Sequence, residues 1–236
     1  YTQGAYVAQY LTFNQMLINI FSFNIIWVFI ECLPILFAVK YGIDLWIWLR
    51  AVLGKKGVAI LSTVISLANF GWYAVTADLF ASSMIHLANN FGLGLDKGVW
   101  APILGTLCVL LGTLIALGGP DVIKGTNRFL VVALLFVGLI IVGICFVAVP
   151  ISDIMNVQPA IQENLTPIER FMMSGEGNVA VAFSWSTQAF VLPRLAKSER
   201  SGYWATALSY GVVAPFFAAT GGVMALAMFV KTGVYE

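Results

Sequence analysis

Six apolar stretches limit what this sequence can fold into. A helix needs about 20 residues to cross the hydrocarbon core of a bilayer, or about 17 when it runs straight. The 236 residues are 60% hydrophobic and only 10% charged, which does not suit a water-soluble globular fold. We therefore predict an all-α membrane protein, a polytopic helical bundle that forms a single transmembrane domain over residues 1–236. Its six predicted spans are 14–39, 58–86, 101–119, 129–150, 178–193 and 203–230.

Basic side chains alternate between the predicted connections. The first, third and fifth connections together hold nine of the 12 Lys and Arg residues: Lys40, Arg50, Lys55, Lys56, Lys124, Arg128, Arg194, Lys197 and Arg200. By the positive-inside rule these connections are cytoplasmic and both chain ends lie outside, in a multi-pass protein of the cytoplasmic membrane. Residues 1–13 show no signal-peptide pattern. We therefore expect one more helix before residue 1, in a longer parent protein.

The sequence lacks residues and motifs that several classes of metal site, haem site and enzyme need. Cys32, Cys108 and Cys145 lie in three different apolar stretches without CxxC spacing, which is typical of packing thiols. His86 is the only histidine, so bis-histidine haem ligation and an HExxH zinc site are excluded. No GxSxG, P-loop or CxxCH motif is present. We predict a protein that is not an enzyme and has no metal site and no cofactor.

One face of the second span combines aromatic and polar side chains. An α-helix turns by about 100° per residue, and at that rotation six of these side chains fall on one face about 100° wide. They are Asn69, Trp72, Tyr73, Thr76, Phe80 and Ser83. Such a surface suits a flat, polar, uncharged ligand, because the ring stacks and the polar groups fix its edge. The alternative is ordinary helix packing, in which Ser, Thr and Asn hold membrane helices together.

The centre of the fifth span is its least apolar part. It contains Phe183, Ser184, Trp185 and Gln188, and Pro193 follows. An interruption of this kind is typical of a discontinuous transporter helix, whose freed backbone groups line a cavity and bind substrate. Alternatively, the hydroxyls bond back to their own helix and Pro193 marks only the helix end.

Glu31 and Asp78 are the only acidic residues inside the predicted spans. Each is a candidate for a proton or cation relay, and the alternative is a protonated or hydrogen-bonded structural carboxyl. Asp78 falls about 240° around the helix from Trp72 and roughly 9 Å outward. We therefore do not expect it to share the aromatic stripe.

Three stretches carry a family resemblance. The run 40–57, KYGIDLWIWLRAVLGKKG, resembles the cytoplasmic loop after the second helix of the nucleobase:cation symporter family, the cytosine, purine, hydantoin and allantoin permeases. The run 69–76, NFGWYAVT, resembles that family's "GWFGxQ" third helix. The run 183–197 resembles its sixth helix, which ends near an Arg before a basic segment. On this register the six spans correspond to helices two to seven of the family.

The resemblance implies a LeuT-type fold of two inverted five-helix repeats, with discontinuous first and sixth helices and alternating access. It makes Trp72 the ring-stacking tryptophan, with Phe183, Ser184 or Trp185 supplying the opposite contacts. Thr76 stands where many members carry a substrate-binding Gln. The sixth helix also lacks the usual "NPDxxR"-like ending.

From these features we predict a secondary active transporter that couples Na⁺ or H⁺ to the symport of a nucleobase or related planar heterocycle. We expect the substrate at the midplane, between Trp72 and the break in the fifth span. Its partners would be this small molecule and the lipid bilayer, without nucleic acid. Two alternatives stay open: an amino-acid or amine symporter of the same fold, and a non-transporting membrane subunit.

Overall fold

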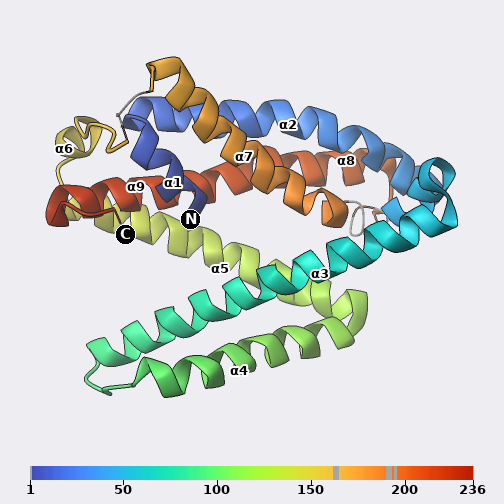
Figure 1. Cartoon of the computed structure of the whole chain (residues 1–236), viewed down its shortest axis with the longest axis horizontal. Helices are drawn as coiled ribbons and strands as arrows, with labels where there is room; N and C mark the ends of the chain where they lie inside the picture. Colours follow the sequence, from blue (N-terminus) through green and yellow to red (C-terminus); the bar gives the residue numbers. More distant parts are fainter. Residues whose placement is uncertain (1, 162–164, 190–192, 194–195, 236) are drawn as a thin grey trace. The chain divides into compact units, whose positions relative to one another are not determined.

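The computed structural model describes residues 2–161, 165–189, 193 and 196–235, and within that part of the chain it contains helices and no strand. Figure 1 shows the order of the elements. They are α1 (Thr2–Tyr10), α2 (Phe13–Tyr41), α3 (Leu45–Asn90), α4 (Lys97–Leu117), α5 (Gly119–Ala148), α6 (Ile151–Met155), α7 (Pro167–Ala189), α8 (Glu199–Leu208), the π-helical turn η2 (Ser209–Val213) and α9 (Ala214–Thr232).

Five helical segments of the described chain are long and apolar enough to cross a membrane. They are α2, α3, α4, α5 and the continuous stretch Glu199–Thr232 that joins α8, η2 and α9. They overlap five of the six predicted spans, and they are compatible with a helical membrane protein. The other predicted span, 178–193, falls on the second half of α7 and then on residues 190–192, which lie outside the described part.

The chain divides into two compact units. Unit 1 comprises residues 1–48 and 135–236, and unit 2 comprises residues 49–134. Unit 1 therefore holds α1, α2, α6 to α9 and the second half of α5. Unit 2 holds most of α3, all of α4 and the first half of α5.

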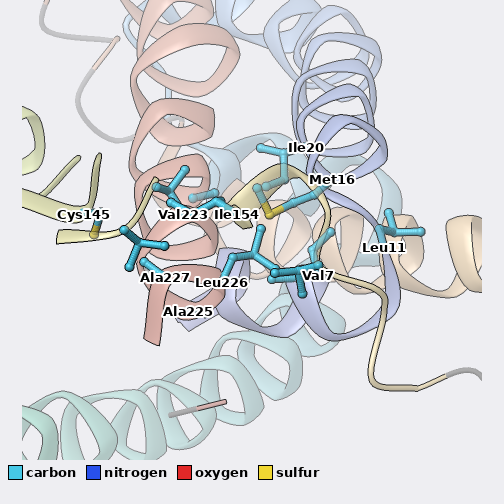
Figure 2. Packing of buried hydrophobic residues seen from close by; sticks show 14 residues of the cluster. Val7, Leu11, Met16, Ile20, Cys145, Ile154, Val223, Ala225, Leu226 and Ala227 are labelled. Atoms are coloured by element: carbon cyan, nitrogen blue, oxygen red, sulfur yellow. The ribbon is translucent and has the colours of Figure 1, made fainter. Parts of the chain in front are cut away.

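The main core of unit 1 joins α1, α2, α6, α9 and the end of α5. Figure 2 shows its side chains pointing toward one another. Its fully buried members include Val7, Met16, Ile20, Ile154 and Leu226. Cys145 lies in this cluster and Cys32 lies in a smaller one on α2, so both are buried in hydrophobic packing, as predicted.

Glycines bring α1 and α9 into close contact. A Cβ atom on Gly4 would overlap the carbonyl oxygen of Ala218, and one on Gly222 would lie 3.2 Å from the carbonyl oxygen of Gly4. Such a crossing is available only to residues without a side chain. The helix α1 was not among the predicted elements, because its nine residues are too short to form a span.

The first predicted connection is largely helical. Asp44 begins α3 by accepting the N–H of Ile47 at 2.9 Å. Gly54 then interrupts the helix with φ +67°, a left-handed conformation that glycine adopts without a Cβ penalty. A second irregularity, the π-helical turn η2, lies inside the last predicted span, and it was not among the predicted elements.

Candidate functional site

The aromatic stripe predicted on the second span exists as one helix face, because α3 runs without a break after Gly54, as far as Asn90. Trp72 is 47% exposed and Tyr73 is 61% exposed. The buried residues Ala77, Ala81 and Ile85 lie on the other side of the helix, centred about 180° from Trp72. In unit 2 the stripe is therefore the open face of α3. We keep the name "aromatic stripe" for Asn69, Trp72, Tyr73, Thr76, Phe80 and Ser83.

The hydroxyl groups of the stripe bond to their own helix. Thr76 Oγ1 donates to the carbonyl oxygen of Trp72 at 2.8 Å, and Ser83 Oγ donates to that of Leu79, also at 2.8 Å. Each hydroxyl has one proton, so what it offers outward is its oxygen lone pairs. The stripe can consequently stack a ring and accept hydrogen bonds from ligand N–H groups.

Asp78 lies away from the stripe, as its position on the helix predicted. It lines a groove of about 520 Å³ between α3 and α4 together with Ala77, Ala101, Pro102, Gly105, Thr106, Val109 and Leu110. A Cβ on Gly105 would lie 3.6 Å from that of Ala77, so the two helices approach closely there. Among the described residues that line this groove, Asp78 alone is charged.

The polar run of the fifth span lies in a continuous helix. Phe183, Ser184, Trp185 and Gln188 belong to α7, whose backbone stays α-helical as far as Ala189. The interruption expected in this span is therefore absent up to that residue, and residues 190–192 lie outside the described part. Because the side chains of 181–189, and that of Glu31 in α2, also lie outside it, the roles expected for them stay predictions.

Unit 1 contains a cluster of amides that the sequence analysis did not single out. Gln3 Nε2 donates to Asn178 Oδ1 at 2.8 Å, and Asn178 Nδ2 donates to the carbonyl oxygen of Ile20 at 3.3 Å. Asn19 Nδ2 donates to the carbonyl oxygen of Phe171 at 2.7 Å. These bonds join α1, α2 and α7. The available signal was the presence of Asn residues inside apolar runs, since such residues are costly in a membrane and mark functional positions.

Within the described residues, no group of three or more His, Cys, Asp or Glu side chains gathers in one place.

Comparison of the chain with protein-family models, curated proteins and solved structures finds no match. What the protein does must be inferred from its own residues.

Proposed function

We propose that this chain is the core of a secondary active transporter of the cytoplasmic membrane, with a LeuT-type fold. It would import a nucleobase or a related small planar heterocycle with Na⁺ or H⁺, by alternating access. The aromatic stripe on α3 carries the proposal, and the resemblance to the nucleobase:cation symporters supports it.

The chemistry of the stripe matches a neutral, flat ligand. The face of the Trp72 indole offers a stacking surface, and stacking of a base on an aromatic side chain contributes about 1–3 kcal/mol. One helical turn from Trp72, the hydroxyl oxygen of Thr76 offers an acceptor, which complements a ring N–H group of uracil, cytosine or hydantoin. No residue of the stripe is charged, so a charged ligand would lose its hydration there without compensation.

An amine or amino acid is the second candidate substrate class. The groove between α3 and α4 favours it, because the carboxyl group of Asp78 is exposed there beside the hydroxyl-bearing Thr106. An ammonium group pairs with a carboxylate more strongly than with neutral oxygens. In this case Asp78, and not Trp72, would determine binding.

Equilibrium binding of radiolabelled ligands to the purified full chain in nanodiscs separates these candidates. The panel contains uracil, cytosine, adenine, hydantoin, an amino acid and a simple amine, with and without Na⁺. We expect saturable heterocycle binding that weakens about 5- to 150-fold in Trp72→Ala, the equivalent of the lost stacking. Trp100→Ala is the matched control, since Trp100 is also an exposed tryptophan of unit 2.

The other outcomes assign the alternatives. If the protein binds the amine, and this binding is lost in Asp78→Asn and kept in Trp72→Ala, the substrate is an amine or amino acid and not a heterocycle. Absence of any ligand binding, together with reduced stability of Trp72→Ala, would indicate a non-transporting membrane subunit.

A further inference from the structure

We propose that unit 1 contains a site for a monovalent cation, Na⁺, at Asn19, where α2 meets the first turns of α7. Oδ1 of Asn19 would be its central ligand. This inference deepens the proposed function by giving the coupling ion a place, and only the ion's role in transport rests on that function.

The first observation is an unsatisfied acceptor in the protein interior. Asn19 is 0% exposed, and its Oδ1 has no hydrogen-bond partner among the described residues. The orientation of the amide follows from the other atom, because Nδ2 donates to the carbonyl oxygen of Phe171 at 2.7 Å, and a flipped amide would set two oxygens against each other. A buried polar group left in this state costs about 1–3 kcal/mol.

The second observation is that the hydroxyl protons around Asn19 are already used. Ser174 Oγ donates to the carbonyl oxygen of Phe171 at 3.0 Å, and Ser22 Oγ donates to the carbonyl oxygen of Asn19 at 3.3 Å. Ser174 is itself fully buried. The described contacts around Asn19 therefore use these protons on backbone carbonyls and leave Oδ1 as an acceptor without a donor. A bound cation complements such an acceptor.

The ligand chemistry selects a monovalent ion. Sites for Ca²⁺ and Mg²⁺ rely on carboxylates, and among the described residues no carboxylate takes part in the hydrogen bonds given above for Asn19, Phe171 and Ser174. Neutral carbonyl-type oxygens are the groups that replace the hydration shell of monovalent ions inside membrane proteins. The charged residues of α7 are Glu169, Arg170 and Glu176, two acidic and one basic, so the net charge of this helix favours a cation.

The position of Asn19 along α2 would allow an ion to reach it from outside. Asn19 lies six residues after the start of α2 at Phe13, and Phe171 and Ser174 lie within the first eight residues of α7. The predicted orientation places both of these helix ends outside. The site is thus within about two helical turns of the external face, roughly 9 Å of rise from the start of α2.

Binding of ²²Na⁺ to the purified full chain, measured by scintillation proximity without any heterocycle, tests the site. We expect saturable binding in the native protein and at least about tenfold weaker binding in Asn19→Leu, which keeps the volume and removes the ligand oxygen. Asn24→Leu is the matched control. Asn24 is a half-buried asparagine on the same helix whose amide donates to the carbonyl oxygen of Ile20 at 2.7 Å, and its replacement should leave Na⁺ binding unchanged.

Ser174→Ala is a smaller change that keeps the test decisive if Asn19→Leu does not fold, and it should also weaken Na⁺ binding. Absence of saturable binding by the folded native chain overturns the proposal, as does binding that neither variant weakens. A stability gain that is equal in Na⁺, K⁺ and choline salts would assign a buried water to Asn19 and would also overturn it. Heterocycle binding that depends on Trp72 without any Na⁺ binding would refute this site alone, and Na⁺ binding without heterocycle binding would refute the proposed function alone.

Discussion

The stretch Glu199–Thr232 buries half of its most apolar 18-residue window inside the protein, whereas the corresponding window of α4 buries none, although their mean hydropathies are close, at 1.9 and 2.1. The difference follows the size of the side chains. The central part of α9 is rich in Ala and Gly, and α4 points Leu, Val and Ile side chains outward. In lipid, apolar character does not drive helices together, but close backbone approach does.

The two units that contain these helices also differ in the hydrogen bonds that their polar side chains form. In unit 1, Asn19 and Asn178 are buried and bond from one helix to another. In unit 2, Thr76 and Ser83 bond to their own helix and stay exposed. Unit 1 therefore uses polar groups to hold its helices together, and unit 2 leaves an aromatic and polar face open.

The largest expected effect is at the crossing of α1 and α9. Gly4→Leu should destabilise unit 1 by more than about 3 kcal/mol, because the new side chain overlaps the backbone of Ala218. Gly112→Leu on α4 should change little by comparison, since nothing lies within 4 Å of a Cβ at that position. Thermal unfolding followed by size-exclusion chromatography measures both, and equal losses would contradict the contrast between the two regions.

A smaller effect is expected from the buried amides. Asn178→Ala removes one hydrogen bond with Gln3 and one with the Ile20 carbonyl, so we expect a loss of about 1–3 kcal/mol. Asn69→Ala on the aromatic stripe is the matched asparagine of unit 2 and should lose less than about 0.5 kcal/mol. Denaturant titration in detergent compares the two. A larger loss at Asn69 would show that unit 2 also depends on its amides.

The smallest effect concerns the N-terminal turn of α7, outside the predicted spans. Hydrogen bonds from Thr166, first from its backbone N–H at 2.7 Å, lower the pKa of Glu169 below its usual value. A lowered pKa means that the carboxylate stabilises this turn at neutral pH and that the contribution disappears as the pH falls through the folded-state pKa. Hydrogen exchange of the amides at 166–171 should accelerate, relative to a reference peptide, as the pH falls over this range. Glu169→Ala, which removes the carboxylate, should show weak protection at every pH. Protection of the native protein that does not depend on pH would contradict the capping role.

The sequence was sufficient for the parts of the structure that depend on local patterns. Hydropathy located α2 to α5 and the last span, and the helical period placed Trp72 and Asp78 on different faces of α3. The helix α1 and the amide cluster escaped prediction because they depend on distant partners. Gln3 and Asn178, for example, are 175 residues apart in sequence. The π-helical turn η2 escaped because nothing in its five residues distinguishes it from α-helix.

The most direct test of the central claim, that a planar ring stacks on Trp72, compares uracil with 5,6-dihydrouracil. The two share the same N–H and carbonyl edge, and only uracil is flat and aromatic. We predict that the native protein binds uracil about 5- to 150-fold more tightly, and that this preference disappears in Trp72→Leu while dihydrouracil binding changes little. Equal affinities in the native protein, or a preference that survives in Trp72→Leu, would contradict the assignment of Trp72 as the stacking residue.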